Sequence, residues 1–516
     1  MGLCARRLFS LTCLLASAPF VTARAQLAPV GVPRGVVRVE LDGRMDIWDS
    51  QYLDGTKVPL SVDLISSTLG SAQLPFLTIA DAQLQRITGI GGYHLDLGGI
   101  VTDAQRDESR GTFGLSVGLT RTVTIFGRIP LVRARAESRI ALDPTGADAG
   151  LNPGGATQDE FFTEMEAALT TLETNIGNGT YSANPSQLAL AQSTLASGNA
   201  LADDLFGLLA DPSTASPFVP TGSSAAGTAV TASVAALQGT LANDLGVTGF
   251  TATPALPAGP LTSEELVAAL TSTTGPVDMR VGDNKVSFRG DAETGVAFTL
   301  MDHWDRDGRR GGFRAAVEGL VRWPTGVRSR ADRLFATGTG DGQTDVEMKV
   351  TADLGAGAVG VRLEGDYNRQ LAADITALVS PPSQPLAGSS LISIVRNDPG
   401  DVTTLTARPF LRLARTLALQ GTVTHWSRGA DAVTYATPAS EIPGVDASVL
   451  AVDTKATATV LGIGLTYANP GALRPGGRGL PVDAGWIYER VVKATGGRVA
   501  NAHAMTARLR VYFGLF

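Results

Sequence analysis

Long segments in which apolar and polar residues alternate one by one recur along this chain of 516 residues. In the segment 37–48, for example, Val37, Val39 and Leu41 alternate with charged residues. Alternation with a period of two puts the apolar side chains on one face of a β-strand and the polar side chains on the other. Each of these strands therefore needs an apolar covering layer on one side and a polar environment on the opposite side.

The same pattern predicts further strands at about 93–106, 112–119, 123–131, 288–301, 312–323, 343–355, 358–370, 402–414, 416–428, 451–467, 480–493 and 499–516. Most of them are about 10 to 14 residues long, whereas strands of soluble proteins cluster near 5–6 residues. A strand tilted by about 45° needs roughly 9–11 residues to cross the hydrocarbon layer of a membrane. The length of these strands therefore favours a protein that spans a bilayer.

Short and long connections alternate between the predicted strands. The short turns lie near 120, 302–311, 356 and 415, and the long loops lie at 143–287, 324–342, 371–401 and 429–448. Outer-membrane barrels have short periplasmic turns at one rim and long extracellular loops at the other. We therefore predict an all-β fold, a transmembrane antiparallel β-barrel with a mainly helical extracellular insertion. The barrel has about 14 strands if residues 58–66 add a strand, or 12 if the segment 37–48 lies outside it.

The last twelve residues, MTARLRVYFGLF, form one more strand with two different faces. Lipid would cover the apolar row of Met505, Leu509 and Phe513, and pairing of this strand with the first one would leave the sheet without a free edge. A final strand that ends in an aromatic residue resembles the C-terminal signature of bacterial outer-membrane barrels. The resemblance implies recognition by the barrel assembly machinery through Phe516.

The N-terminus has the pattern of a secretory signal. Arg6 and Arg7 precede an apolar run, and small residues flank Arg24, which predicts a cleaved signal peptide at 1–25. Cleavage removes these three arginines and takes the formal charge from −7 to −10. Nucleic-acid binding relies on basic patches, so we expect no nucleic-acid partner. The predicted location is the outer membrane of a Gram-negative-type bacterium, with outer-membrane lipid as a partner.

Two further divisions of the chain follow from the pattern. The first barrel strands occupy residues 26–142, and the remaining barrel strands occupy 288–516. Within the first part, residues 73–90 carry apolar side chains at helical spacing. This helix is a possible plug of the lumen if it lies on the periplasmic side. The alternative is a surface helix under the barrel.

The insertion at 143–287 is expected to be helical. Two candidate capping boxes, Thr157 with Glu160 and Thr262 with Glu265, precede apolar runs. The apolar stripes consist of Phe161, Phe162, Met165, Ala168, Leu169, Leu172, Val230, Val234, Leu237, Leu241 and Leu245. We predict three or four helices that pack on one another as a small extracellular cap. The alternative is that their stripes line an entrance for solute.

Sequence motifs for catalysis or cofactor binding are missing. Both cysteines, Cys4 and Cys13, lie in the predicted signal, so the mature chain has no thiolate ligand or nucleophile. The glycine-rich segment 338–345 lacks the Lys-Ser/Thr of a phosphate-binding loop. In the segment 302–308, His303 stands where a calcium loop needs an acidic ligand, and no Glu closes the loop. The four histidines are scattered along the chain. We therefore expect no catalytic, cofactor or metal site and no enzymatic activity, with an outer-membrane hydrolase as a remote alternative.

The polar rows of several strands predict the lining of a lumen. The candidate residues are Arg314, Glu318, Arg322, Asp345, Glu347, Lys349, Arg362, Glu364, Asp366, Arg408 and Arg412. Charges of both signs inside a barrel can shape the path of a solute. They can equally neutralise one another as a structural ladder, and both interpretations stay open for each residue.

Three segments carry a resemblance to a known group. GLTRTVTIFGRIPLVR at 118–133, GTGDGQTDVEMKVTADL at 338–354 and GDYNRQ at 365–370 resemble bacterial outer-membrane barrels of the phenol-degradation MetA-type and FadL-type transporter group. The resemblance covers most of the strand region but not the helical insertion. It implies uptake of small hydrophobic or amphipathic solutes by passive diffusion through a barrel lumen. The alternative is a structural or surface-interaction barrel whose extracellular helices bind a partner.

Overall fold

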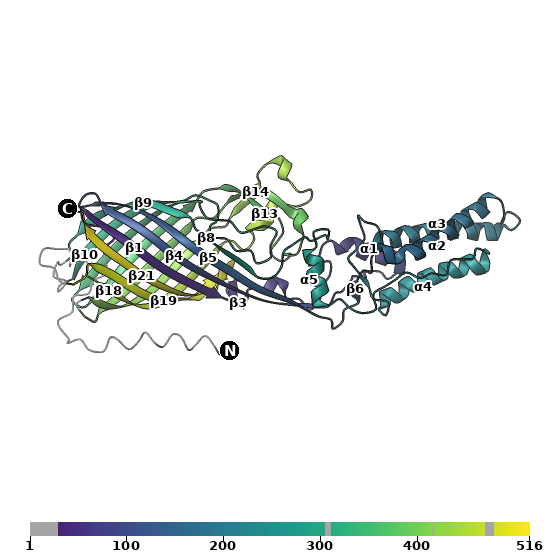
Figure 1. Ribbon diagram of the computed structural model, residues 1–516, viewed down its shortest axis with the longest axis horizontal. Coiled ribbons are helices and arrows are strands. Elements are labelled where there is room, and N and C mark those ends of the chain that lie inside the picture. Colours follow the sequence, from purple (N-terminus) through teal and green to yellow (C-terminus); the bar gives the residue numbers. More distant parts are fainter. Residues whose placement is uncertain (1–28, 305–310, 415, 470–478, 516) are drawn as a thin grey trace.

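A closed antiparallel β-barrel forms the main body of the protein (Figure 1). The computed structural model describes residues 29–304, 311–414, 416–469 and 479–515. Twelve of the described strands form the ring, because β1 pairs on one side with β4 and on the other with the last strand, β21. The predicted signal peptide and Phe516 lie outside the described residues, as does most of the segment 302–308.

The strands of the ring are β1 (Val36–Trp48), β4 (Gly99–Gly118), β5 (Val123–Asp143), β9 (Ala292–Asp302), β10 (Gly311–Trp323), β11 (Asp345–Ala356), β12 (Val359–Gln370), β15 (Val402–Arg412), β16 (Leu417–Arg428), β18 (Ala456–Ala468), β19 (Val482–Thr495) and β21 (His503–Gly514). An additional strand, β8 (Asn284–Arg289), pairs with β5 just beyond the end of β9. The all-β barrel predicted from the alternation is therefore confirmed.

The prediction of about 14 strands is wrong, and the alternative of 12 is correct for a different reason. The segments predicted at 93–106 and 112–119 belong to one strand, β4, which is 20 residues long and pairs with β5 throughout. Residues 58–66 add no strand to the ring, because they contain the end of the short strand β3 (Thr56–Pro59) and a 3-10 turn. The segment 37–48 is β1, and it lies within the ring.

The connections divide the barrel into two rims. At the short-turn rim, residues 119–122 join β4 to β5 and residues 357–358 join β11 to β12. The connections 49–98, 324–344, 371–401 and 429–455 lie at the long-loop rim. Three of them contain short strands: 49–98 contains β2 (Ser50–Leu53) and β3, 371–401 contains β13 (Ala373–Leu378) and β14 (Ile392–Asp398), and 429–455 contains β17 (Ala432–Tyr435). The strand β20 (Arg498–Ala500) pairs with β2 at the same rim.

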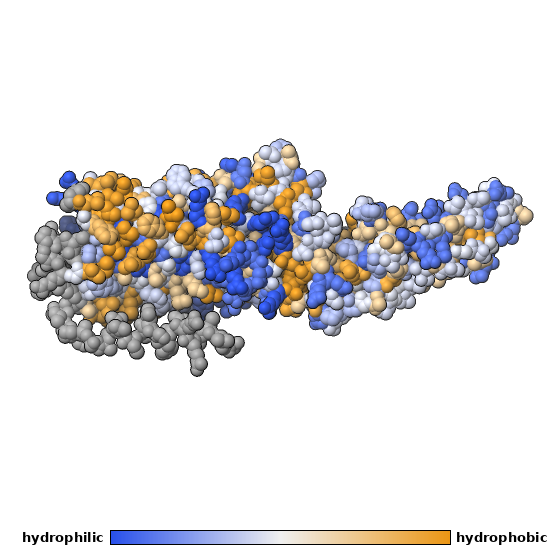
Figure 2. Space-filling view, viewed as in Figure 1, coloured by the Kyte–Doolittle hydropathy of each residue, from blue (hydrophilic) through white to orange (hydrophobic). Residues whose placement is uncertain are grey.

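Apolar side chains cover the outside of the barrel. Val423 on β16 and Leu461 on β18 lie opposite each other in register, and each is 45% exposed. Their neighbours Gln420 and Thr422 face inward and are buried. Figure 2 shows hydrophobic residues gathered over the half of the barrel nearer the short-turn rim. A band of this kind requires an apolar surrounding, and a closed ring satisfies the backbone hydrogen bonds that lipid cannot.

A helical extension rises from the long-loop rim and points away from the barrel (Figure 1). It contains the helices α1 (Leu77–Thr88), α2 (Asp159–Gly177), α3 (Pro185–Leu209), α4 (Ala225–Gly239) and α5 (Ser263–Thr271), with the strand pair β6 (Ala149–Leu151) and β7 (Phe218–Pro220) near its base. No helix in the described part of the chain is both long and apolar enough to cross a membrane.

The largest hydrophobic core of the described residues belongs to this extension and not to the barrel. The predicted stripes of α2 and α4 contribute to it through Phe161, Leu172, Val230 and Leu237. The possible plug helix at 73–90 is α1, and it packs against α3 and α4 within the same core. Its apolar face is buried among other helices, so it lies in the extension and not in the lumen.

One of the two predicted capping boxes is present. The Thr262 hydroxyl accepts a hydrogen bond from the Glu265 amide, and the Glu265 carboxylate accepts one from the Thr262 amide. The other prediction is wrong, because residues 155–158 form a 3-10 turn and α2 begins only at Asp159. The Thr157 hydroxyl donates instead to the carbonyl of Pro153.

The exposed apolar band makes a direct prediction. Leu363 on β12 faces outward and is 43% exposed, so Leu363→Arg places a charge against lipid. We expect this substitution to lower the free energy of unfolding in lipid vesicles by about 2–4 kcal/mol, measured by urea titration. The matched control is Leu190→Arg on α3, whose side chain is 38% exposed in the extension. Equal losses in the two variants would contradict a lipid-facing band.

Candidate functional site: the charged lumen

The inward-facing rows of neighbouring strands bring opposite charges side by side. In the register of β10 and β11, Arg314 lies opposite Asp353 and Arg322 lies opposite Asp345. In the register of β11 and β12, Asp353 lies opposite Arg362. Directly opposed side chains in a sheet are close enough to interact. The alternating sequence of each strand therefore becomes a set of cross-strand ion pairs when the ring closes.

The most buried set is centred on Asp353. Arg314 Nη2 lies 2.6 Å from Asp353 Oδ2, and Arg362 Nε lies 2.7 Å from Asp353 Oδ1. All three side chains are under one-tenth exposed. One carboxylate shared by two guanidinium groups compensates part of the cost of taking these charges out of water.

A second set is centred on Arg322. Its guanidinium lies 2.6 Å from Asp345, 3.3 Å from Glu293 on β9 and 3.4 Å from Glu347. This arginine therefore joins three adjacent strands, β9, β10 and β11. Its side chain is partly exposed, and it reaches the open part of the lumen.

A third set joins the strands at which the barrel closes. Glu40 on β1 lies 2.6 Å from Arg38, 3.2 Å from Arg510 on β21 and 3.6 Å from Arg128 on β5. Beside it, the Tyr512 hydroxyl donates to Asp483 at 2.6 Å. These residues were not among the lumen candidates predicted from the sequence, although Arg38 and Glu40 belong to the polar row of the clearest strand pattern.

The structure places the predicted lumen residues on the inward rows of β10, β11, β12 and β15, and most of them pair with one another. Besides the two sets above, Lys349 lies 3.9 Å from Asp366, and Arg408 lies 3.1 Å from Glu364. Glu318 lies opposite Lys349 in register. Arg412 donates to the carbonyl of Gly357 at the short-turn rim.

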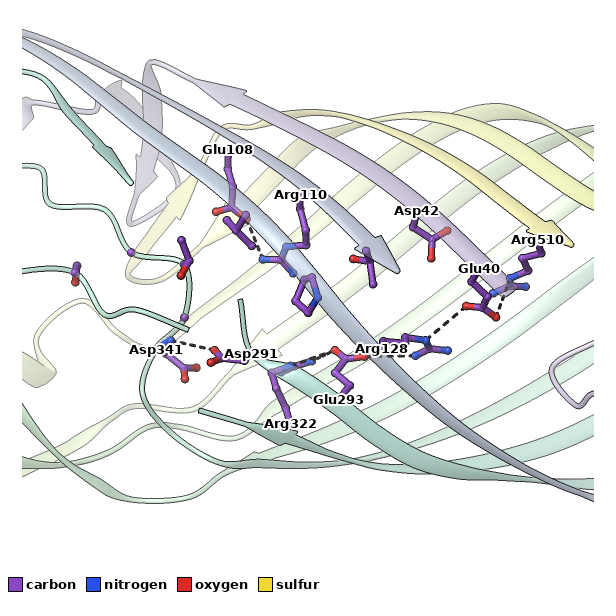
Figure 3. A pocket seen from close by; sticks show the side chains of 17 residues that line it. Glu40, Asp42, Glu108, Arg110, Arg128, Asp291, Glu293, Arg322, Asp341 and Arg510 are labelled. Atoms are coloured by element: carbon purple, nitrogen blue, oxygen red, sulfur yellow. Dashed lines mark hydrogen bonds and ion pairs between the residues drawn. The ribbon is translucent and has the colours of Figure 1, made fainter. Parts of the chain in front are cut away.

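A cavity of about 670 Å³ occupies the lumen toward the long-loop rim (Figure 3). Its charged lining consists of Glu40, Asp42, Glu108, Arg110, Arg128, Asp291, Glu293, Arg322, Asp341 and Arg510. Of the eleven candidates from the sequence, Arg322 alone lines this cavity. The cavity belongs mainly to β1, β4, β5, β9 and the loop 324–344, whose residues become neighbours only when the ring closes.

The loop between β10 and β11 folds into the mouth of this cavity. The carboxylate of Asp291 accepts hydrogen bonds from the amide of Gly326 at 2.8 Å and from the amide of Asp341 at 3.3 Å. A Cβ atom on Gly340 would lie only 2.5 Å from the Asp291 oxygens, so only glycine allows this close approach. The Gly-Thr-Gly segment thus has a structural role at the entrance of the lumen.

Residues 29–33 fill part of the lumen at the short-turn rim. The Val32 amide donates to Thr124 Oγ1 at 2.9 Å, and Arg38 Nη1 donates to the carbonyl of Val30 at 3.0 Å. The Val30 side chain packs against a small apolar cluster of Phe126, Ala297 and Leu320. This segment and the cluster separate the large cavity from a smaller one of about 370 Å³ at the short-turn rim.

Trp304, from the turn after β9, also points into the short-turn end of the barrel. Its ring is buried against Phe410 and Ala418, and the guanidinium carbons of Arg314 and Arg412 lie 4.8 and 5.6 Å from the ring centre. Arginine over a tryptophan face is a favourable cation–π contact. At the short-turn end, aromatic, apolar and charged side chains therefore narrow the lumen. At the long-loop end, charged side chains line a wider cavity.

The chemistry available in the lumen is electrostatic. Within the described residues, no three His, Cys, Asp or Glu side chains come together in a group that could hold a metal ion. The large cavity instead offers guanidinium and carboxylate groups on facing walls, which orient a solute that carries charge or a strong dipole.

Several solved structures are similar to the chain in fold. The COG4313 outer membrane channel from Pseudomonas putida F1 is 11% identical over 95% of this chain and 100% of that chain, with a TM-score of 0.43. The TodX deltaS2S3 mutant monoaromatic hydrocarbon channel is 9% identical over 94% and 91% of the two chains, with a TM-score of 0.29. The transport unit of the autotransporter AIDA-I from Escherichia coli is 5% identical over 94% and 93%, with a TM-score of 0.33.

Scores this low carry no argument about the solute or the mechanism. Neither family models nor curated proteins gave a match to the sequence. The function must therefore be inferred from the geometry of this chain.

The set around Asp353 makes a testable prediction. Asp353→Asn removes the charge shared by Arg314 and Arg362, so we expect the free energy of unfolding to fall by about 3–5 kcal/mol. The control is Asp374→Asn, which breaks a half-exposed pair with Arg396 and should cost under about 1 kcal/mol. Denaturant titration of both variants in the same lipid provides the comparison. If Asp353→Asn lowers the free energy of unfolding no more than Asp374→Asn does, the buried ion pairs around Asp353 do not stabilise the barrel.

Proposed function

We propose that the protein is an outer-membrane channel through which small amphipathic solutes pass by diffusion. The observation that carries this proposal is the lumen cavity of about 670 Å³, lined by both guanidinium and carboxylate groups. The apolar outer band and the closed ring support a place in a membrane. The proposal includes export by the signal peptide at 1–25, assembly through the C-terminal strand and no enzymatic step.

The charge of the lining bears on the solute. The resemblance seen in the sequence implies hydrophobic or amphipathic solutes, and a purely apolar solute would have to displace water from ten charged side chains without replacing their hydrogen bonds. A solute with a charged or strongly polar group and a small apolar part meets the charged cavity first and the apolar cluster around Phe126 next. The geometry therefore favours the amphipathic class.

A surface-interaction barrel is the second candidate function. The observation that favours it is the helical extension, which projects away from the barrel and has a hydrophobic core of its own (Figure 1). Single-channel recording in planar bilayers distinguishes the two candidates. A channel gives discrete current steps and solute uptake into liposomes, whereas the interaction protein gives neither.

The segment at the short-turn rim predicts a change in conductance. Replacing Val30 and Val32 by Ser removes apolar side chains that hold residues 29–33 in the lumen. The loss is about 2–3 kcal/mol, which lowers the equilibrium constant for docking of this segment by roughly 30-fold to 150-fold. We expect larger or more frequent current steps. Replacing Leu190 and Val452, exposed apolar residues outside the ring, by Ser should leave the current unchanged, and a similar rise there would contradict the prediction.

The set around Arg322 predicts a change in ion selectivity. Arg322→Gln leaves the carboxylates of Glu293, Asp345 and Glu347 without the cation they share. The negative potential of the cavity increases, so cations should be preferred more strongly. The measurement is the reversal potential across a bilayer with unequal salt concentrations. The control Arg396→Gln removes the same charge outside the ring, and a shift of equal size in it would exclude a role for the lumen.

A further inference from the structure

The outer wall of the barrel changes abruptly from apolar to basic along β5. The outward row of this strand contains Ile129 and Leu131, which are 51% and 65% exposed. The next outward residues toward the long-loop rim are Arg133 and Arg135. The change from an aliphatic to a charged row within two residues marks the upper edge of the apolar band at this position.

The register with β8 gathers three cations at this edge. Arg133 lies opposite Ser287, and Ser287 is flanked along the same face of β8 by Lys285 and Arg289. Direct neighbours across a sheet are about 5 Å apart and diagonal neighbours about 7–8 Å apart. We name Arg133, Lys285 and Arg289 the wall cluster. Figure 2 shows hydrophilic residues gathered in the middle of the molecule, between the hydrophobic band and the helical extension.

The wall cluster contains three cations without a direct ion pair in the described part of the chain. Among the described residues, no carboxylate oxygen lies within 4.0 Å of the charged groups of Arg133, Lys285 or Arg289. On the same strand, by contrast, Arg135 pairs with Glu137. Three positive charges side by side without a direct ion pair create a local positive potential, which attracts an anion from outside.

One member of the cluster is held in place. Arg289 Nε donates to the carbonyl of Thr325 at 3.1 Å. Thr325 is itself fixed, because its hydroxyl donates to the carbonyl of Gly290 at 2.8 Å. A guanidinium fixed at one nitrogen keeps its other N–H groups available in a planar arrangement, which suits phosphate oxygens.

We propose that the wall cluster is a binding site for the phosphate of an anionic outer-leaflet lipid. The acyl chains of this lipid lie along the row of Ile129 and Leu131, and its phosphorylated headgroup meets Arg133, Lys285 and Arg289. The apolar and basic parts of the wall are continuous, so they match the acyl chains and the phosphorylated headgroup of a single lipid molecule. This inference rests on the proposed membrane location, because only a barrel in a bilayer brings a lipid headgroup to the edge of the apolar band.

The test compares two triple variants of the full mature chain. R133S/K285S/R289S removes the wall cluster, and the control R330S/R396S/K455S removes the same charge from exposed residues of the long-loop rim. Each protein is reconstituted into phosphatidylcholine vesicles or phosphatidylcholine vesicles containing phosphorylated lipid A, and retained lipid is measured by native mass spectrometry. We expect the wild type and the control to bind lipid A about tenfold or more tightly than the wall variant, which corresponds to one charge-assisted contact or more. The variant R133K/R289K keeps the charge but loses the planar guanidinium groups, so it should bind lipid A more weakly than the wild type and more tightly than the wall variant.

Four outcomes would overturn the inference. Equal lipid A binding by the wall variant and the wild type would exclude the site. An equal loss of binding in the control would mean that binding depends on the total positive charge of the protein and not on these three residues. Competition by millimolar inorganic phosphate as strong as that by lipid A would show a site for free phosphate. Failure of the membrane proposal is recognised separately, because the wild type would then stay out of both kinds of vesicle. A wild type that inserts and conducts but shows no preference for lipid A contradicts this inference alone.

Discussion

Charge pairing across neighbouring strands is the interaction on which the rest of this structure depends. A barrel in lipid must place the polar row of every strand inside, and in this chain those rows are rich in arginine and carboxylates. Burial of these inward charges is tolerated because most of them meet opposite charges on the same or on nearby strands. Asp353 between two arginines, Arg322 among three carboxylates and Glu40 among three arginines are three such sets.

The same pairing organises the space inside the ring. Where pairs are direct and buried, as around Asp353, the side chains occupy the lumen. Around Arg128, which lies 3.6 Å from Glu40 on β1 and 3.5 Å from Glu293 on β9, the side chains line a cavity instead of filling the lumen. Residues 29–33 and Trp304 then narrow the short-turn end. The width and the polarity of the lumen therefore change along the barrel axis. A wide cavity lined by charged side chains lies toward the long-loop rim, and a constriction with apolar, aromatic and charged side chains lies at the short-turn rim.

The sequence predicted the barrel well, because strict alternation over long segments is compatible with few folds besides a membrane barrel. It failed on the strand count at β4, since a strand that continues past the edge of the apolar band shows a change of pattern but no break in pairing. Arg322 was found as a cavity residue because it lies in a dense run of charges. Arg128, Glu293 and Asp291 were missed, because their partners in the cavity come from distant parts of the chain. Closure of the ring, and not local spacing, makes them a site.

The pair of β4 and β5 continues beyond the ring as a two-stranded ribbon that leads toward the helical extension. The ribbon is tied to the helices, since the Leu142 amide donates to the hydroxyl of Ser263 at the start of α5. Bending this ribbon would shear a continuous hydrogen-bonded ladder. The ladder and this hydrogen bond therefore connect the distant helices to the wall of the barrel where β4 and β5 enter it.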